Sequence, residues 1–200
     1  MTSGYDEIYR GLLPRLATCD FRETAGRLGG EMTGDGVCIR FLGRDYFIDA
    51  GGIEPKDGCP ADANTRSVLV YYITSPGAGE PTLDFAPLNR FTGLIEGRNT
   101  LTAGIMNLPL IREFGSDYAK FRSAAAKLGG NEQLSSSPGK HIWNIYVLPK
   151  ILSQIIFYEA DEEFPADIQI RFDLVSRRFL EFECLAVLTG CMVKGLLSAG

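Results

Sequence analysis

The sequence predicts a single α+β domain in which a mainly antiparallel sheet packs against N-terminal, central and C-terminal helices. Three observations predict it: an alternating hairpin over residues 37–49, strand candidates between residues 142 and 173, and helical spacing of apolar residues in three parts of the chain. The 200 residues fit one domain of ordinary size. We expect an N-terminal helix and hairpin (1–52), a central region of helix and loop (53–137), and C-terminal strands and helix (138–200).

The N-terminal part begins with a helix and continues with the hairpin. Apolar side chains recur every three or four residues over 5–16, which is typical of an amphipathic helix, and Pro14 bends or ends this helix. Apolar and polar residues then alternate over 37–41, as in a strand with one buried face. Gly43-Arg44 has the form of a two-residue turn, so the chain returns as a second strand over 45–49.

The central part mixes helix and strand signals. The β-branched and aromatic residues of 67–74 favour a strand, whereas Asn64-Thr65 before them also suits a capped helix. Scattered Gly, Pro and Asn predict short strands and loops over 83–106. Helical spacing predicts one helix over 109–128, which Gly129-Gly130 ends.

The C-terminal part carries the clearest strand pattern. Apolar runs over 142–148 and 151–158 are separated by Pro149 and predict two strands. Strict alternation over 168–172 predicts a third strand, with one buried and one wet face.

The chain closes with a predicted helix over 179–197. Glu181 and Glu183 stand in its first turn and Lys194 in its last, where each complements the helix dipole. Apolar residues cover most of its circumference, which is typical of a core helix. Since the sequence contains no run of 18 apolar residues and no secretory leader, we expect a cytoplasmic protein without membrane contact.

Charge and residue counts exclude several classes of function. The chain has 20 Lys and Arg against 25 Asp and Glu, a net charge of −5, which argues against a nucleic-acid partner. His141 is the only histidine, so the chain alone cannot build a three-histidine zinc site or a two-histidine iron site. The five cysteines form an odd set without a CxxC pair, which predicts reduced thiols and no disulfide framework.

The most distinctive motif is an acidic turn between two predicted strands, over residues 158–166. Four of its carboxylates fall within five positions, and crowded carboxylates raise a pKa or recruit a cation. A solvated loop is also acidic without any chemistry, and the spacing is not that of an EF-hand. We predict that this turn is a recognition edge, with binding residues Tyr158, Asp161, Glu162, Glu163 and Phe164.

The remaining motifs give no complete catalytic set, and we predict no catalytic residue. Pro138-Gly139-Lys140 before His141 lacks the pattern of a phosphate loop, and no GxSxG occurs. His141 at a strand start is most simply a capping or surface residue. Aromatic residues on or near the predicted strands could line a pocket, but core packing is the favoured explanation of the same residues: Tyr46, Phe47, Phe85, Phe91, Trp143, Tyr146, Phe157, Tyr158 and Phe172.

Several stretches together resemble the domain-of-unknown-function 3786 family. The segments LPKILSQIIFYEADEEFPADIQIRFD and FLEFECLAVLTGCMVKGLL look like its C-terminal signature, most specifically at DEEFPA and FD. FLGRDYFIDAGG, VLVYYI, LDFAPLNRFTG and LGG follow in the family's order, so the resemblance covers nearly the whole chain.

The resemblance implies a small soluble protein of anaerobic bacteria or archaea and a helix over 67–74. Some family members carry a cysteine-rich iron–sulfur segment, which this sequence lacks. Tyr158 stands where members often have tryptophan. The family has no established activity, so the resemblance supplies no catalytic residue and no cofactor.

These observations leave more than one function open. Our main hypothesis is a cytosolic accessory protein, not an enzyme, that binds a small molecule or a protein partner through the acidic turn. One alternative is a cation-dependent enzyme that uses residues 159–163. A weaker alternative is a tetrapyrrole or corrinoid site in which His141 coordinates the metal. Neither the ligand nor the oligomeric state follows from the sequence.

Overall fold

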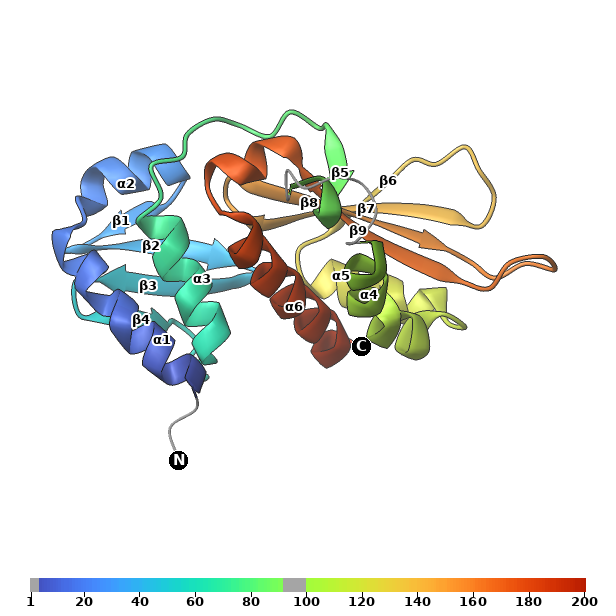
Figure 1. Cartoon of the computed structure of the whole chain (residues 1–200), viewed down its shortest axis with the longest axis horizontal. Coiled ribbons are helices and arrows are strands. Elements are labelled where there is room, and N and C mark those ends of the chain that lie inside the picture. The colour runs from blue at the N-terminus through green and yellow to red at the C-terminus, as the bar shows by residue number, and fades with distance from the viewer. Residues whose placement is uncertain (1–3, 92–99) are drawn as a thin grey trace.

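A computed structural model describes residues 4–91 and 100–200, with side chains over 6–91 and 106–200. The fold is α+β, with two antiparallel sheets packed against helices, as the sequence predicts. Figure 1 shows α1 and α3 in front of the first sheet, α4 and α5 beside the second, and α6 between the two groups. Buried side chains of both sheets and of α6 belong to one hydrophobic cluster.

The first sheet contains the predicted hairpin. Its strands, in spatial order, are β1 (Glu31–Thr33), β2 (Gly36–Phe41), β3 (Arg44–Asp49) and β4 (Gly52–Pro55). Val37, Ile39 and Phe41 of β2 are buried while Arg40 is exposed, so apolar alternation alone placed the buried face correctly.

The hairpin turn differs from the prediction by one residue. Phe41 pairs with Arg44, so the turn consists of Leu42-Gly43 and not of Gly43-Arg44. Both turn residues have positive φ, 48° and 79°, as a type I′ turn requires. Leucine rarely adopts this conformation, and here its backbone N–H donates to the Val147 carbonyl oxygen of the other sheet at 3.0 Å.

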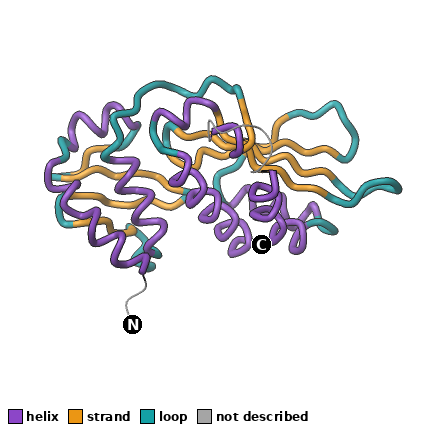
Figure 2. Tube along the Cα trace, in the orientation of Figure 1, coloured by secondary structure: helices purple, strands orange, loops and turns teal. Residues whose placement is uncertain are grey.

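The second sheet holds the three predicted C-terminal strands in its centre. Its spatial order is β5 (Phe85–Pro87), β9 (Asp167–Asp173), β8 (Ile151–Tyr158), β7 (Lys140–Leu148) and β6 (Asn131–Gln133). Ile168, Ile170 and Phe172 of β9 are buried, as predicted, but the opposite face is not the wet face that was expected, because Gln169 and Arg171 are only partly exposed and Asp173 is fully buried. A loop over 74–84 crosses from the first sheet to the second (Figure 2).

The N-terminal helices follow the predicted pattern. They are α1 (Gly4–Leu12), the 3-10 helix η1 (Leu13–Thr18) and α2 (Phe21–Leu28). The α-helix gives way to the 3-10 helix at Pro14, because proline cannot donate the next helical hydrogen bond.

The strand that propensity favours over 67–74 is wrong, and the helix implied by the family resemblance is correct. This segment belongs to α3 (Ala63–Ile73), which Asp62 caps by accepting a hydrogen bond from the Thr65 N–H at 2.8 Å. Burial stabilises the helix despite its β-branched residues, since Val68 and Val70 are fully buried.

The predicted helix over 109–128 is two helices, α4 (Thr100–Phe114) and α5 (Tyr118–Lys127). They separate at Gly115, where a Cβ atom would lie 2.5 Å from the Ile111 carbonyl oxygen. Of the short strands and loops predicted over 83–106, the strand β5 is present, followed by the 3-10 helix η2 (Leu88–Phe91). The prediction is wrong from residue 100 on, where α4 begins, and residues 92–99 lie outside the described residues.

The C-terminal helix α6 (Phe182–Ala199) follows the 3-10 helix η3 (Leu174–Arg178). The prediction that Lys194 stands in the last turn of this helix is wrong, because the helix continues to Ala199. The Lys194 ammonium group instead pairs with the Asp62 carboxylate at 2.6 Å. Among the described elements, α6 alone has the length and mean hydropathy, 1.5, of a membrane span, a property that core helices share. Its buried residues contact α3, α4 and α5.

Candidate functional site

The predicted acidic turn is closed by its own hydrogen bonds. A carboxylate oxygen of Asp161 accepts from the backbone N–H groups of Glu163, at 2.9 Å, and Phe164, at 2.7 Å. The Asp161 N–H in turn donates to the Phe164 carbonyl oxygen at 3.0 Å. These backbone donors lower the pKa of Asp161. The backbone of the turn is therefore built around one carboxylate, that of Asp161.

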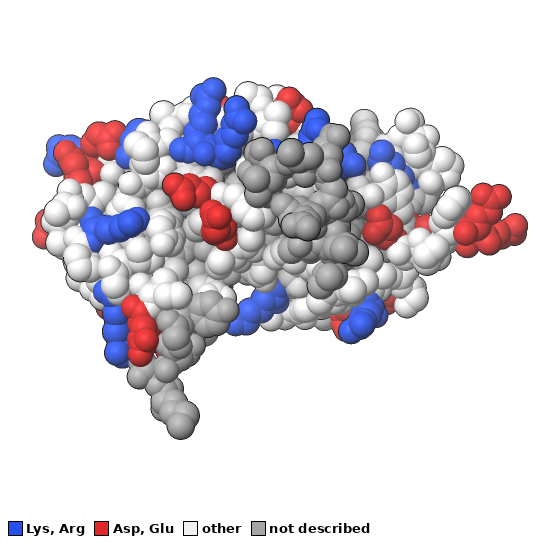
Figure 3. Space-filling view, viewed as in Figure 1, with Lys and Arg blue, Asp and Glu red and all other residues white. Residues whose placement is uncertain are grey.

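Beside this turn lies a hollow of about 500 Å³. Tyr158, Asp161 and Phe164 line it, whereas Glu162 and Glu163 do not. All residues of the turn from 161 to 165 are exposed, and Phe164 keeps 66% of its surface accessible. Figure 3 shows acidic side chains gathered at the tip of the molecule where β8 and β9 are joined. Of the five predicted binding residues, three thus share one hollow.

His141 lies in a polar cluster that the sequence analysis missed. Its Nε2 atom lies 2.7 Å from Glu159 Oε1, and its Nδ1 atom lies 3.4 Å from Glu132 Oε1. The two ring nitrogens thus face two different carboxylates. Among the residues that the structure describes, no three His, Cys, Asp or Glu side chains are placed to hold a metal ion.

Tyr118 of α5 completes this cluster. Its ring stacks on the His141 ring, and its hydroxyl donates to Glu132 and accepts from Trp143 Nε1 at 3.1 Å. Burial, reinforced by Glu132, raises the pKa of Tyr118 to about 12. Alternation along β7 is enough to place His141 and Trp143 on one face of the strand. That Tyr118 of α5 and Glu132 of β6 lie beside them is visible only in the tertiary structure.

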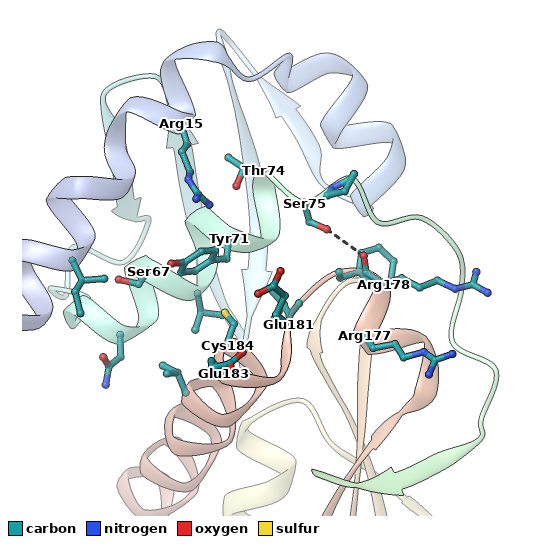
Figure 4. Close-up of a pocket in the computed structure, with 17 residues that line it drawn as sticks. Arg15, Ser67, Tyr71, Thr74, Ser75, Arg177, Arg178, Glu181, Glu183 and Cys184 are labelled. Carbon is teal, nitrogen blue, oxygen red and sulfur yellow. Dashed lines mark hydrogen bonds between the residues drawn. The ribbon is translucent and has the colours of Figure 1, made fainter. Parts of the chain in front are cut away.

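A larger cavity lies elsewhere, between the N-terminal helices and α6. It measures about 710 Å³ and opens between α1–η1, α3 and the start of α6 (Figure 4). Its lining residues are Ile8, Arg15, Asn64, Ser67, Val68, Tyr71, Thr74, Ser75, Pro76, Arg177, Arg178, Phe179, Leu180, Glu181, Glu183, Cys184 and Val187.

One face of α3 forms one side of this cavity. Asn64, Ser67, Tyr71 and Thr74 recur at helical spacing, so their side chains project from the same side. The deeper part is apolar, with Val68 fully buried and with Phe179 and Leu180 almost so. The cavity therefore combines an apolar base with a polar rim.

Neighbouring contacts hold the upper edge of the cavity in place. Arg27 of α2 donates from Nη1 to the carbonyl oxygens of Ser75, at 2.6 Å, and Gly77, at 2.8 Å. Ser75 is buried, and its hydroxyl donates to the Arg178 carbonyl oxygen at 3.5 Å. The edge thus ties α2 to η3, so the cavity is formed without a ligand.

Charged side chains of both signs surround the cavity. The Arg15 guanidinium lies 5.3 Å from the centre of the Tyr71 ring. Figure 4 shows Arg15 and Glu181 directed toward the same space above Tyr71, whereas Arg177 and Arg178 extend away from it. Arg15 and Glu181 are thus the charged groups that a molecule in the cavity would meet.

Cys184 is the only thiol in the lining of this cavity. Burial, assisted by Cys191 and the negative charge of Glu181, raises the pKa of Cys184 to about 12. Because the thiolate is the nucleophile, this cysteine is unreactive near neutral pH. The described lining contains no histidine.

Sequence reasoning did not locate this cavity. Its residues come from four segments of the chain, 8–15, 64–76, 177–181 and 183–187, and none of them forms a motif alone. One sequence feature could have indicated the cavity: the polar residues Asn64, Ser67 and Thr74 in a segment that is otherwise largely apolar. These residues lie on one face only if the segment is helical.

Comparison with known proteins supports the resemblance found in the sequence. The family model named Domain of unknown function (DUF3786) matches residues 20–195, a range that includes most of the fold and the residues named above as lining the cavity, apart from Ile8 and Arg15. The chain belongs to this DUF3786 family. No curated protein and no solved structure matches it.

Proposed function

We propose that this protein is a non-catalytic accessory protein of the cytoplasm that binds a small molecule in the cavity between α1–η1, α3 and α6. The observation that carries the proposal is the cavity itself. Its volume of about 710 Å³ falls in the range of small-molecule sites, roughly 300–1,000 Å³. An apolar base with a few polar groups at the rim is also the usual composition of such sites.

A blocking variant tests this proposal. Ser67→Trp places a large ring in the cavity, on the side formed by α3. Ser123→Trp, on the exposed face of α5, is a matched control. A library of drug-sized fragments is screened against all three proteins by saturation-transfer NMR. We expect a set of fragments that bind the wild type and the control and lose their signal with Ser67→Trp. If every fragment signal survives in Ser67→Trp, the cavity is not the binding site and the proposal fails.

The acidic turn supports a second candidate function, recognition of a basic segment of a protein partner. The favouring observation is that Asp161 fixes the backbone of the turn while Phe164 stays exposed beside Glu162 and Glu163, whose carboxylates have no ion-pair partner among the described residues. A turn whose backbone is already fixed loses less entropy when it binds.

An NMR titration with a lysine-rich peptide tests this second function. We expect amide shift changes confined to 159–165 and abolished in Glu162→Gln/Glu163→Gln, with the exposed Glu31→Gln as control. Phe164→Ala should weaken binding at least about tenfold, because aromatic anchors contribute most of the affinity at such contacts. If Phe164→Ala shows the same shift changes as the wild type, the interaction is unspecific charge attraction and the second function is wrong.

A further inference from the structure

Two charges of opposite sign enter the cavity without pairing with each other. Within the described part of the chain, the Arg15 side chain takes part in no hydrogen bond or ion pair, and its guanidinium lies over the Tyr71 ring. The Glu181 carboxylate likewise has no hydrogen-bond or ion-pair partner among the described residues, and it gives no side-chain cap to α6. Both groups come from separate elements, η1 and the residue before α6, and both point inward (Figure 4).

The surroundings of these two charges argue against a ligand that carries one charge only. An anion would meet Arg15, but it would also meet Glu181. A cation would meet Glu181, but it would lie beside Arg15. In each case one protein charge would lose water without gaining a partner, which costs free energy.

The space between the two charges is apolar. The Tyr71 ring is 36% exposed toward the cavity rim, and Val68 and Leu180 close the base. A molecule that reaches both charges must therefore also cover an aromatic ring and aliphatic side chains. Burial of this surface favours a ligand with an apolar or aromatic body.

We propose that the cavity takes a zwitterionic small molecule with an apolar or aromatic body, its carboxylate at Arg15 and its ammonium group at Glu181. This inference rests on the proposed small-molecule function and adds the class of ligand. Free α-amino acids with large side chains are the simplest members of that class. Arginine suits the carboxylate end because its guanidinium can donate two parallel hydrogen bonds.

Calorimetry with four related probes tests the ligand class. L-tryptophan carries both charges, and N-acetyl-L-tryptophan keeps only the negative charge. L-tryptophanamide keeps only the positive charge, and N-acetyl-L-tryptophanamide carries neither. We expect L-tryptophan to bind at least about tenfold more tightly than each derivative, which corresponds to one satisfied charge. L-Leucine should bind as well, although with less apolar contact.

Two substitutions assign the ends of the ligand. Arg15→Gln should remove the preference for L-tryptophan over L-tryptophanamide and keep the preference over N-acetyl-L-tryptophan. Glu181→Gln should remove the preference over N-acetyl-L-tryptophan and keep the preference over L-tryptophanamide. Arg15 and Glu181 are exposed and make no structural hydrogen bond with their side chains, so both variants should fold. Arg22→Gln and Glu31→Gln, exposed on α2 and β1, are the matched controls.

The outcomes separate the ligand class from the site. If the neutral derivative binds as tightly as L-tryptophan and Ser67→Trp abolishes both, the cavity binds small molecules and the zwitterion inference is wrong. If neither amino acid binds while library fragments do, the inference is wrong and the proposed function stands. If neither the probes nor any fragment distinguish the wild type from Ser67→Trp, both fail together.

Discussion

The ring of Tyr118 stacks on the ring of His141, the only histidine of the chain, with their centroids 3.5 Å apart and their planes inclined by 15°. This contact joins α5 to β7. Glu132 connects the pair to β6, and Glu159 connects it to the end of β8. One cluster thus ties a helix to three neighbouring strands, and it stands next to the acidic turn.

Removal of the Tyr118 hydroxyl should destabilise the protein. Tyr118→Phe keeps the stacked ring but leaves Trp143 Nε1, in a residue only 4% exposed, without its acceptor. We expect the free energy of unfolding to fall by about 1–2 kcal/mol. Urea unfolding measures it, and Tyr146→Phe, on a 53% exposed residue, is the control and should change little. Equal effects of the two substitutions would contradict a structural role for the cluster.

The pair of Asp62 and Lys194 should make stability depend on pH in acid. Burial raises the pKa of Asp62, but hydrogen bonds from Lys194 and Thr65 outweigh it, so the pKa lies below its usual value of 3.8. A lowered pKa means that the pair stabilises the fold above about pH 4 and that this stability is lost as the pH falls through the folded-state pKa. Because both side chains are partly exposed, water limits the effect to at most about 1 kcal/mol.

Asp62→Asn tests this pair, since asparagine keeps the helix cap and removes the charge. We expect the variant to be less stable than the wild type at pH 7, and we expect this difference to shrink as the pH falls below about 4, as measured by thermal unfolding across pH. A difference that persists unchanged at pH 3 would show that the charge of Asp62 is not its cause.

The buried thiols of α6 should resist alkylation. Burial raises the pKa of Cys184 to about 12 and that of Cys191 to about 11, whereas Cys59 is exposed. From a usual value of 9, the shift at Cys184 alone lowers its thiolate population about a thousandfold. Mass spectrometry after iodoacetamide treatment at pH 8 should find Cys59 labelled and Cys184 unlabelled until urea unfolds the chain. Rapid native labelling of Cys184 would mean that the cavity base opens.

Two glycine substitutions should act in opposite directions. Gly43 has a φ of +79°, and a Cβ there would lie 3.3 Å from the Lys127 carbonyl oxygen, so Gly43→Ala should cost about 1–2 kcal/mol. Gly26 lies in α2 with open space around it, so Gly26→Ala should stabilise by up to about 1 kcal/mol. Denaturant unfolding compares them. A neutral Gly43→Ala would contradict the turn at Leu42-Gly43.

Apolar periodicity was sufficient to predict much of the fold. Alternation located the hairpin and the central strands of the second sheet, because a sheet with one buried face repeats every two residues. It failed over 67–74, where the residues are buried on nearly all sides and the periodicity disappears. It also missed the break at Gly115, which depends on a backbone contact with Ile111.

The candidate site was less predictable, for a physical reason. Local sequence revealed the acidic turn, since its carboxylates are adjacent in the chain. The cavity depends on Arg15, Tyr71 and Glu181, which are far apart in sequence and come together only when α3 is helical and α6 packs beside it. The partners of His141 are hidden in the same way, because Glu132 and Tyr118 precede it on other elements.

The most direct test of small-molecule binding is mass spectrometry of the compounds that the protein retains through purification from its natural host. The wild type and Ser123→Trp should release the same compound on denaturation, and Ser67→Trp should release none of it. Recovery of that compound from Ser67→Trp in the same amount would contradict a ligand site in the cavity between α1–η1, α3 and α6.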